Sequence, residues 1–348
     1  YFPNEGFKKS LLDIPGKDNP LIHAYQSQNP QGKVDYVTYY SSTIGCYNNA
    51  LIYTPASYNP ADNKRYPVFY LISGTTDTEE VYYKVGRMNT IIDNLIAEGK
   101  AEEMIIVLPY GNPVKLMDQP ADFAMDLFSN DLINDLMPYV EANYLTINDA
   151  EHRAIGGFSR GGNQALSNGL MNLDKFSYLC SYSSFTSTQL PYVYDHAKET
   201  NSKINLFWLG IGTDDLLYKT SHDYIEFLRK KGINHMLEFT KGKFGHTWMN
   251  AKYFLAQTMP LLFNKEKATA AMSDGGMPLP ELKGDEEEFN PLVMSRLFPP
   301  QVTSPEFGQG NVTFRIKAEN AQEVLLSGEM LTAPMPMQRD SVGVWEIT

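Results

Sequence analysis

Residues 156–163 read GGFSRGGN and place one serine hydroxyl among glycines. The stretch from Gly157 to Gly161 fits the pattern G-x-S-x-G, in which the serine, here Ser159, stands on a strained turn between a strand and a helix. Small neighbours allow a close approach of the backbone and leave the serine oxygen exposed as a nucleophile. A glycine-rich turn without chemistry is the alternative interpretation, and the elements on either side must decide between the two.

A serine becomes a nucleophile only when a base takes its proton and a third group orients that base. In proteins with this turn, the chain order is serine, then Asp or Glu, then histidine. His246 fits this order, because it lies in the glycine-containing stretch KGKFGHTW after the last predicted strand. Asp214 and Asp215 follow a buried strand in GIGTDDLLY, and one of them is expected to support His246 while the other caps or solvates the turn. The remaining histidines fit less well by order or position: His23, His152, His196, His222 and His235.

Attack on an ester carbonyl also requires N–H groups for the oxygen that becomes negatively charged. The backbone N–H of Arg160, directly after the serine, is the first candidate. The second is expected in the Ser73–Thr76 loop after the apolar run YPVFYLI, with Gly74 and Thr75 as the donors. The candidates for contacts with a substrate are Arg160, Thr76 and Trp248.

Strand and helix patterns alternate along the chain from about residue 34 to 262. Apolar runs predict strands at 34–42, 48–55, 66–74, 104–112, 152–158, 177–184, 204–212 and 235–240. Amphipathic periodicity predicts helices over 87–99, 129–144, 163–171 and 222–232, with Gly99 and Gly232 as stops and Ser129 as an N-cap. This alternation predicts an α/β fold with a mostly parallel sheet covered on both faces and a site at the carboxyl ends of the strands. Ser159 has a strand before it and a helix after it, which favours the nucleophile interpretation.

The character of the chain changes after about residue 264. The next stretch is rich in Pro, Gly and charge, and its acidic run at 285–288 is expected to be a solvated spacer rather than a metal site. Short alternating runs such as NVTFRIKA then indicate strands. We expect an α/β domain at 1–265, a linker at 266–290, and a β-sandwich module at 291–348 that is incomplete, since a full one needs ~100 residues.

The composition indicates a protein that acts on uncharged material. Of 348 residues, 43% are hydrophobic, and 41 acidic against 29 basic residues give a net charge of −12, which argues against nucleic acid and anionic membranes as partners. We find no run long enough to span a bilayer, and the chain begins at Tyr1 without a methionine, so export stays open. Cys46 and Cys180 are expected to be free thiols rather than a disulfide, and we expect no metal and no cofactor.

Over roughly residues 30–265 the chain resembles carbohydrate esterase family 1, which holds feruloyl esterases and acetylxylan esterases. The resemblance rests on GKVDYVTYYSSTIG, IIDNLIAEGKAEEMIIVLPYGN, EHRAIGGFSRGG, GTDDLLY and GHTW. It implies an α/β-hydrolase fold and a serine carboxylesterase, with Asp215 from the G-T-x-D motif and His246 from the GHTW loop completing the catalytic set of Ser159. Ser73-Gly74 replaces the usual His-Gly, and Arg160 follows the nucleophile where relatives often have Met. These departures leave the backbone donors in place, so activity is expected to survive, and they bear on the shape of the pocket and on the substrate preference.

The resemblance implies that feruloyl or acetyl groups are removed from plant xylan by a secreted, periplasmic or cell-surface protein. The stretch from 299 to 330 is similar to the start of immunoglobulin-like modules of the glycogen-binding type. An aromatic acyl group is favoured, because the indole of Trp248 offers stacking area near the base. The same indole would alternatively pack under the loop and hold His246. A siderophore esterase, a thioester hydrolase and a non-catalytic glycan-binding protein are the other candidate functions.

Overall fold

The structure is a computed structural model of residues 1–348, and it describes residues 26–75, 77–112, 124–240, 245–273, 278–280, 306–308, 310–318, 321–326, 331, 333–341 and 343–348. The chain divides into two compact units, Tyr1–Leu282 and Lys283–Thr348. Ser159 and the other residues of its predicted site belong to the first unit.

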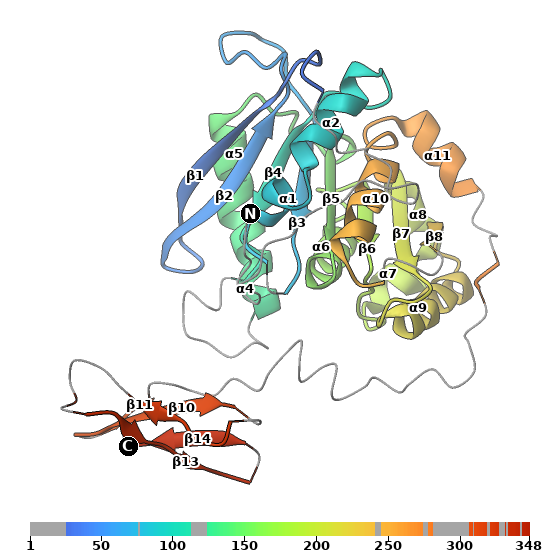
Figure 1. Ribbon diagram of the computed structural model, residues 1–348. Coiled ribbons are helices and arrows are strands. Elements are labelled where there is room, and N and C mark those ends of the chain that lie inside the picture. Colours follow the sequence, from blue (N-terminus) through green and yellow to red (C-terminus); the bar gives the residue numbers. More distant parts are fainter. Residues whose placement is uncertain are drawn as a thin grey trace. The chain divides into compact units, whose positions relative to one another are not determined.

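The first unit is built around an eight-stranded sheet (Figure 1). Its strands are β1 (Lys33–Ser41), β2 (Cys46–Thr54), β3 (Val68–Ile72), β4 (Ile105–Pro109), β5 (Arg153–Phe158), β6 (Tyr178–Tyr182), β7 (Leu206–Gly212) and β8 (Met236–Thr240). Their order in the sheet is β1-β2-β4-β3-β5-β6-β7-β8. β2 runs antiparallel to β1 and β4, and all the following neighbours pair in parallel. The predicted α/β fold with a mostly parallel sheet is confirmed.

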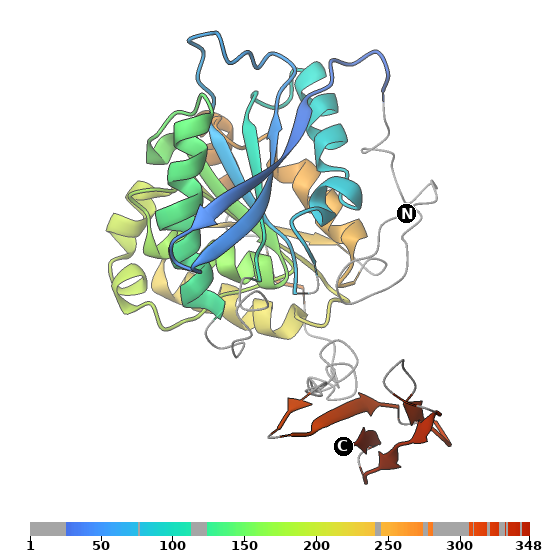
Figure 2. The ribbon, with the colours of Figure 1, turned by 90° about the vertical axis from the view of Figure 1, so that its left-hand side faces the viewer.

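Helices cover both faces of this sheet, as Figure 2 shows on either side of the edge strand β1. They are α1 (Val81–Lys84), α2 (Met88–Ala97), α4 (Ala124–Asp131), α5 (Met137–Asn143), α6 (Arg160–Met171), α7 (Pro191–Asp195), α8 (Ala197–Lys203), α9 (Tyr218–Lys231), α10 (Trp248–Thr258) and α11 (Lys265–Ser273), with a π-helical turn at Leu132–Leu136 and a 3₁₀ turn at Ala150–His152. One buried hydrophobic core joins the sheet to α6 and α9, and a second joins its other face to α2 and α10. The inner strands are continuous apolar runs because both of their faces are covered.

The predicted helix stops at Gly99 and Gly232 are confirmed. α2 and α9 end just before these glycines, whose φ angles are 65° and 72°. A glycine adopts this left-handed conformation without the steric cost that other residues meet, so it ends a helix well.

The helix predicted over 129–144 starts earlier than expected. It spans Ala124–Asn143 and contains the π-helical turn in its middle. Ser129 is therefore an interior residue and not the N-cap, so that prediction is wrong. Tertiary contacts help to fix the helix, because Asp131 Oδ2 accepts a 2.6 Å hydrogen bond from the Tyr39 hydroxyl of β1.

The helix α11 lies where the linker at 266–290 was predicted to begin. Ala268 of α11 is fully buried, and Met272 Sδ accepts a hydrogen bond from the backbone N–H of Phe207 at 3.2 Å. Further along, the carbonyl of Pro280 accepts a 2.7 Å hydrogen bond from the hydroxyl of Tyr218. The first unit therefore continues past the predicted boundary at 265, and that boundary is wrong. The sequence signal was weak because α11 is short and rich in alanine.

A chain shortened to Leu282 is expected to keep the thermal stability of the first unit, whereas a chain that ends at Asn264 is expected to lose part of it. Removing α11 exposes the apolar surface around Ala268, which costs roughly 2 kcal/mol or more and lowers Tm by about 5 °C. Thermal unfolding of the two shortened chains and the full chain, followed by circular dichroism, measures this. Equal Tm values for all three would show that α11 adds nothing to the core.

The second unit consists of short antiparallel strands. They are β9 (Glu306–Phe307), β10 (Val312–Lys317), β11 (Leu325–Leu326), β12 (Met335–Pro336), β13 (Gln338–Arg339) and β14 (Val344–Ile347). Four of them form a sheet in the order β13-β14-β10-β9, and β11 pairs with β12. Trp345 is buried in this unit, and its indole N–H donates to the carbonyl of Ala318 at 3.0 Å. The predicted change from α/β to short strands is confirmed.

Both cysteines are free thiols, as predicted. Cys46 is partly buried in β2, and Cys180 is buried in β6, where burial raises the pKa of its thiol. Among the described helices, none combines the length and the apolar character that a membrane span requires.

Candidate active site

The G-x-S-x-G stretch forms a tight turn between β5 and α6. Ser159 has φ 56° and ψ −124°, a conformation that residues with a side chain rarely adopt. Its backbone N–H donates to the carbonyl of Tyr182 in β6 at 3.0 Å. The turn follows the last residue of a parallel strand, so it presents Ser159 at the carboxyl edge of the sheet.

The two glycines of the motif allow this turn to pack against β3. A Cβ atom on Gly161 would lie 2.2 Å from the carbonyl oxygen of Ile72 and 2.5 Å from that of Ser73. A Cβ atom on Gly157 would lie 2.5 Å from the carbonyl carbon of Gly161. These distances are shorter than any real Cβ contact, and the opposing atoms are backbone. Only glycine therefore fits at both positions.

The substitution Gly161→Ala is expected to lower the free energy of unfolding by about 3 kcal/mol, because the added methyl group must push α6 away from β3. Gly99→Ala is the control, since a Cβ atom there meets nothing within 4 Å. The control should cost only the strain of its positive φ, about 1 kcal/mol. Urea unfolding of both variants measures the difference, and equal costs would contradict the crowding argument.

Ser159 belongs to a hydrogen-bonded chain with His246 and Asp215. His246 Nε2 lies 2.8 Å from Ser159 Oγ, and His246 Nδ1 lies 3.0 and 3.1 Å from the two carboxylate oxygens of Asp215. The backbone N–H of Leu217 also donates to Asp215 Oδ1 at 2.8 Å. The carboxylate accepts a hydrogen bond from the protonated Nδ1. Nε2 therefore carries no proton and can accept the hydrogen bond of the serine hydroxyl. The three residues are thus arranged for proton transfer from the serine.

Of the two neighbouring aspartates, the structure brings Asp215 to the histidine. The side chain of Asp215 is 0% exposed, whereas Asp214 is exposed on the turn after β7. Two adjacent aspartates look alike in the sequence. The choice between them depends on which side chain of the turn points inward.

The loop that carries His246 is held by Asn250, which the sequence analysis missed. Asn250 is fully buried, its Nδ2 donates to the carbonyl of Gly245 at 2.9 Å, and its Oδ1 accepts from the Thr240 hydroxyl at 2.8 Å. The imidazole of His246 also stacks on Phe158, with ring centroids 4.8 Å apart. The sequence carried no clear signal for it, because the buried residues of α10 also include the polar Lys252 and Thr258.

The loop after β3 passes directly beside the serine. A Cβ atom on Gly74 would lie 3.6 Å from Ser159 Cβ. The N–H of Gly74, predicted as an oxyanion donor, donates instead to Asp77 Oδ2 at 3.0 Å, so the structure contradicts that prediction. The N–H of Thr75 meets no acceptor among the residues that the structure describes, and it is the candidate donor that this loop retains. Thr76 lies outside the described residues.

The side chain of Arg160 binds the backbone of this same loop. Its Nη2 donates to the carbonyl of Gly74 at 3.0 Å, and the N–H of Asp77 donates to the same carbonyl at 3.3 Å. Gly74 is therefore held at both of its backbone groups. The side chain of Arg160 thus positions the loop, and its contact with a substrate stays a prediction. Its backbone N–H stands at the first position of α6, where the other oxyanion donor was predicted.

Trp248 packs beneath the loop that carries the base. Its ring lies 4.8 Å from the ring of Tyr82 and 5.5 Å from that of Phe158, measured between centroids. Phe158 in turn stacks on His246. These contacts favour the interpretation in which Trp248 supports His246 over the one in which it lines an acyl pocket.

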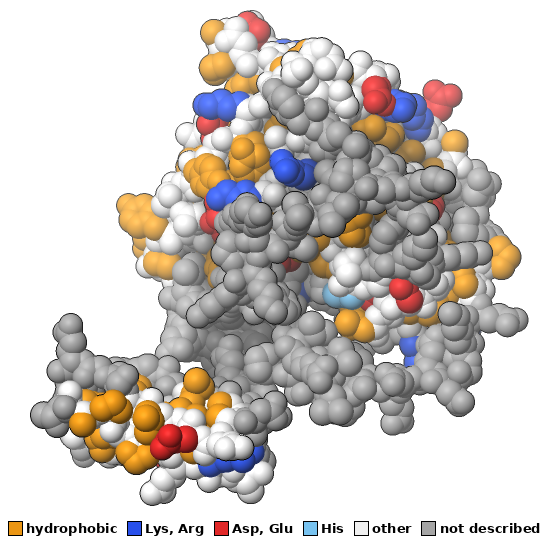
Figure 3. Space-filling view, viewed as in Figure 1, with side chains coloured by type: hydrophobic (Ala, Val, Ile, Leu, Met, Phe, Trp, Pro, Cys, Tyr) orange, Lys and Arg blue, Asp and Glu red, His pale blue; other side chains and the backbone are white. Residues whose placement is uncertain are grey.

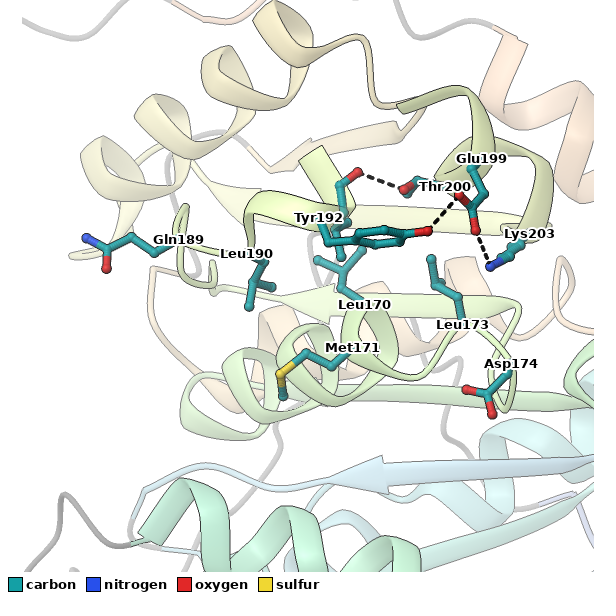
Figure 4. Close-up of a pocket in the computed structure, with 11 residues that line it drawn as sticks. Leu170, Met171, Leu173, Asp174, Gln189, Leu190, Tyr192, Glu199, Thr200 and Lys203 are labelled. Carbon is teal, nitrogen blue, oxygen red and sulfur yellow. Dashed lines mark hydrogen bonds and ion pairs between the residues drawn. The ribbon is translucent and has the colours of Figure 1, made fainter. Parts of the chain in front are cut away.

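A separate cavity of about 410 Å³ lies between the end of α6 and the helices α7 and α8 (Figure 4). Tyr192 stands at this cavity, and its hydroxyl donates to Glu199, which also accepts from Lys203. The cavity reaches α6 at Leu170, about 16 Å along the helix from Ser159. None of the three bonded residues Ser159, Asp215 and His246 lines it, so it is not the centre of the proposed chemistry.

A serine on a strained strand-to-helix turn, bonded to a histidine and a buried aspartate at the carboxyl edge of a parallel sheet, defines the α/β-hydrolase class. The family model described as "Putative esterase" matches residues 41–242, and the chain belongs to this esterase family. The matched range contains Ser159 and Asp215 and ends before His246.

Proteins with similar sequence or fold include feruloyl esterases. The endo-1,4-beta-xylanase/feruloyl esterase of Xylanibacter ruminicola is 33% identical over 175 residues, which are 49% of this chain and 24% of that protein. The chain thus spans about a quarter of this curated relative. The CE1 ferulic acid esterase of Anaeromyces mucronatus, solved with ferulic acid, superimposes with a TM-score of 0.60 at 22% identity, over 74% of this chain and 100% of that one.

A second solved structure widens the range of chemistry found on this fold. The enterobactin esterase of Shigella flexneri matches with a TM-score of 0.53 at 16% identity, over 70% of this chain and 62% of that one. The family model and the curated relative confirm the predicted esterase family, and the solved structures confirm the predicted α/β-hydrolase fold.

Proposed function

We propose that this protein is a serine carboxylesterase that removes feruloyl groups from plant cell-wall xylan. The observation that carries the proposal is the bonded chain of Ser159, His246 and Asp215 on the strained turn. The xylanase/feruloyl esterase relative and the fold shared with a ferulic acid esterase support the feruloyl group as the acyl part. Acetyl groups on xylan are the second candidate, because the sequence resembles acetylxylan esterases as well.

The proposed reaction begins with transfer of the Ser159 hydroxyl proton to His246 Nε2, while Oγ attacks the carbonyl carbon of the ester. The carbonyl oxygen becomes an oxyanion and accepts hydrogen bonds from the N–H groups of Arg160 and Thr75. When this intermediate collapses, the bond to the sugar oxygen breaks and His246 gives its proton to that oxygen. The sugar leaves, and the acyl group stays on Ser159.

Water completes the cycle by the same steps. His246 takes a proton from a water molecule, the water oxygen attacks the acyl carbon, and the Ser159 oxygen leaves with the proton from His246. Asp215 stays ionised throughout and stabilises the imidazolium that forms twice. The acid is released, and the serine is restored.

The proposed partners are feruloylated or acetylated xylan and its oligosaccharides. Because a polymer of this kind is met outside the cell, we propose that the protein is secreted, periplasmic or attached to the cell surface. The second unit is proposed to be an immunoglobulin-like module that binds carbohydrate, since its short antiparallel strands accompany the resemblance of residues 299–330 to such modules.

The test uses the purified full chain and its Ser159→Ala variant with methyl ferulate, p-nitrophenyl acetate and feruloylated arabinoxylan. The native chain is expected to release ferulate from the polymer, as measured by chromatography, and the variant is not. Release of acetate without ferulate would overturn the assignment of the acyl group. Activity confined to enterobactin or to a thioester would overturn the substrate class.

The substitution Trp248→Ala is expected to lower kcat/KM for methyl ferulate and for an acetyl ester by similar factors of between about 10 and 100. The reason is that the indole supports Phe158 and His246, and a displaced base slows both reactions alike. Steady-state kinetics on both esters measure the two factors. A loss restricted to the ferulate would instead place the indole in the acyl pocket.

A further inference from the structure

Three exposed tyrosines form a row on one face of the β1–β2 hairpin. Four aromatic side chains are exposed in the described part of the chain, and three of them are Tyr36 (59%), Tyr40 (57%) and Tyr47 (70%), here called the tyrosine row. Figure 3 shows hydrophobic side chains gathered over this hairpin at the left of the view. Exposed apolar groups that gather in this way mark binding surfaces more often than scattered ones do.

The strand register places the row on a single face. Side chains alternate along a strand, so Tyr36 and Tyr40 point to the same side of β1, at a spacing of about 13 Å. Tyr40 pairs with Tyr47 on β2, and their rings meet edge to face with centroids 5.5 Å apart. The row therefore offers ring surface at two places along the hairpin, the pair of Tyr40 and Tyr47 and, beside Lys84 Nζ at 5.7 Å from its ring centroid, Tyr36.

The surface between Tyr36 and the pair of Tyr40 and Tyr47 is polar but carries no charge of its own. Thr38 and Asn49 are a cross-strand pair, and the Thr38 hydroxyl donates to Asn49 Oδ1 at 2.9 Å. Beyond Tyr36, Glu80 is paired with Lys84, so the charges at that end offset each other. This sequence of rings and uncharged polar groups suits a neutral ligand with apolar faces and hydroxyl edges.

The row leads to the edge of the sheet where Ser159 stands. Ala50 of β2 pairs with Pro109, the last residue of β4, so residues 46–49 extend beyond the carboxyl edge of the parallel strands. At the other end, the Tyr36 hydroxyl donates to Glu80 Oε1 at 2.9 Å. Glu80 directly precedes α1, and the stretch between β3 and α1 begins with the loop that carries Gly74, next to Ser159. The end of the row with Tyr40 and Tyr47 therefore lies at the carboxyl edge of the sheet, the edge at which Ser159 stands.

The tip of the hairpin is held in a fixed position by Asp135. Its carboxylate accepts hydrogen bonds from the N–H groups of Ser42 and Thr43 at 3.1 and 3.0 Å, and from the Ser42 hydroxyl at 2.6 Å. Burial alone would raise the pKa of Asp135, but these hydrogen bonds outweigh it and lower that pKa to about 2. The tip is therefore anchored to the helical segment before β5, and a ligand that binds there meets a surface already in place.

We propose that the tyrosine row binds the sugar rings of a neutral polysaccharide main chain and guides its ester-bearing branches to Ser159. Pyranose rings have apolar C–H faces that stack on tyrosine, and hydroxyl edges that reach the pair of Thr38 and Asn49. The net charge of −12 disfavours polyanions as occupants. The inference rests on the proposed function for the ester site, but the binding of the main chain is a separate property.

Binding is tested with Ser159→Ala, so that turnover plays no part, both in the full chain and in a chain shortened to Leu282, which lacks the second unit and its proposed carbohydrate binding. The probe is arabinoxylan without ester groups, cast in a native gel. Adding Tyr40→Ala and Tyr47→Ala is expected to raise the apparent Kd by roughly tenfold or more, as the loss of two ring contacts implies. Tyr192→Ala is the matched control, because that ring is also exposed (62%) but lies at the separate cavity. Unchanged retardation of the double variant in the shortened chain, or an equal loss in the control, would overturn the proposal.

Kinetics provide a second measurement with Ser159 intact. The double variant is expected to raise KM for feruloylated arabinoxylan by about tenfold with kcat unchanged, and to hydrolyse methyl ferulate as the native chain does. Equal losses on both substrates would mean damage to the fold and would sink the proposal. So would a change from dimer to monomer in sedimentation with unchanged KM, since the row would then join two copies of the chain. If the native chain releases no ferulate at all, the proposed function fails, and the gel measurement still decides whether the row binds polysaccharide.

Discussion

Replacing Ser159 by alanine is expected to lower kcat/KM for methyl ferulate by about 10³-fold or more. The variant loses the oxygen that lies 2.8 Å from His246 Nε2, and with it the acyl-enzyme. The residual rate would come from binding and from the oxyanion donors alone. Because alanine keeps the Cβ atom, the backbone of the turn should be unaffected, and an unchanged Tm verifies this.

The matching substitution His246→Ala is expected to cause a loss of similar size, and the double variant should be little worse than either single one. Both residues take part in the same proton transfer. Once one of them is removed, that transfer is lost, so removing the other lowers the rate little further. His152→Ala is the control, since that histidine lies before β5 at the opposite edge of the sheet. Single-turnover and steady-state rates of the four chains measure this, and additive losses would refute a shared step.

Asp215→Asn is expected to lower kcat by about 10³- to 10⁴-fold, whereas Asp214→Asn should change it by less than about threefold. The amide would present an N–H to His246 Nδ1, which then must act as an acceptor. Nε2 would carry the proton and could no longer accept the one from Ser159. The buried site keeps its shape, because asparagine fills the same volume and its oxygen can still accept from the N–H of Leu217.

Kinetics of the two asparagine variants on one small ester provide the comparison, with Tm as a check of folding. A larger loss in Asp214→Asn would assign the supporting role to the exposed aspartate and contradict the geometry. Equal small losses would mean that the imidazole keeps its tautomer without either carboxylate.

Most of the first unit could be predicted from the sequence because its strands are buried on both faces. Such strands are uninterrupted apolar runs, as in β3 and β4, and the glycines at 99 and 232 end their helices for local steric reasons. The helix α11 escaped prediction because its place in the core comes from packing against β7, where Met272 accepts a hydrogen bond from Phe207. A short alanine-rich stretch gives no sequence signal for such packing.

The site residues that a motif or the order along the chain identifies could be predicted from the sequence. Residues whose role depends on the direction of a side chain could be predicted less well. Ser159 and His246 follow from the turn and from the order of residues. The choice between Asp214 and Asp215 needs the path of the turn after β7. The hydrogen bond that engages the N–H of Gly74 depends on the direction of the Asp77 carboxylate, which no motif encodes.

The packing of Gly157 and Gly161 against the backbone of neighbouring elements has a consequence for the evolution of such chains. Both glycines are required by the assembly of β3, β5 and α6, whether or not a substrate is ever hydrolysed. A descendant that lost its catalytic ability would still be under selection to keep them, as long as it had to fold. In a newly read sequence, the two glycines of the pentapeptide therefore indicate the fold. Only the hydroxyl, imidazole and carboxylate groups at 159, 246 and 215 indicate catalysis.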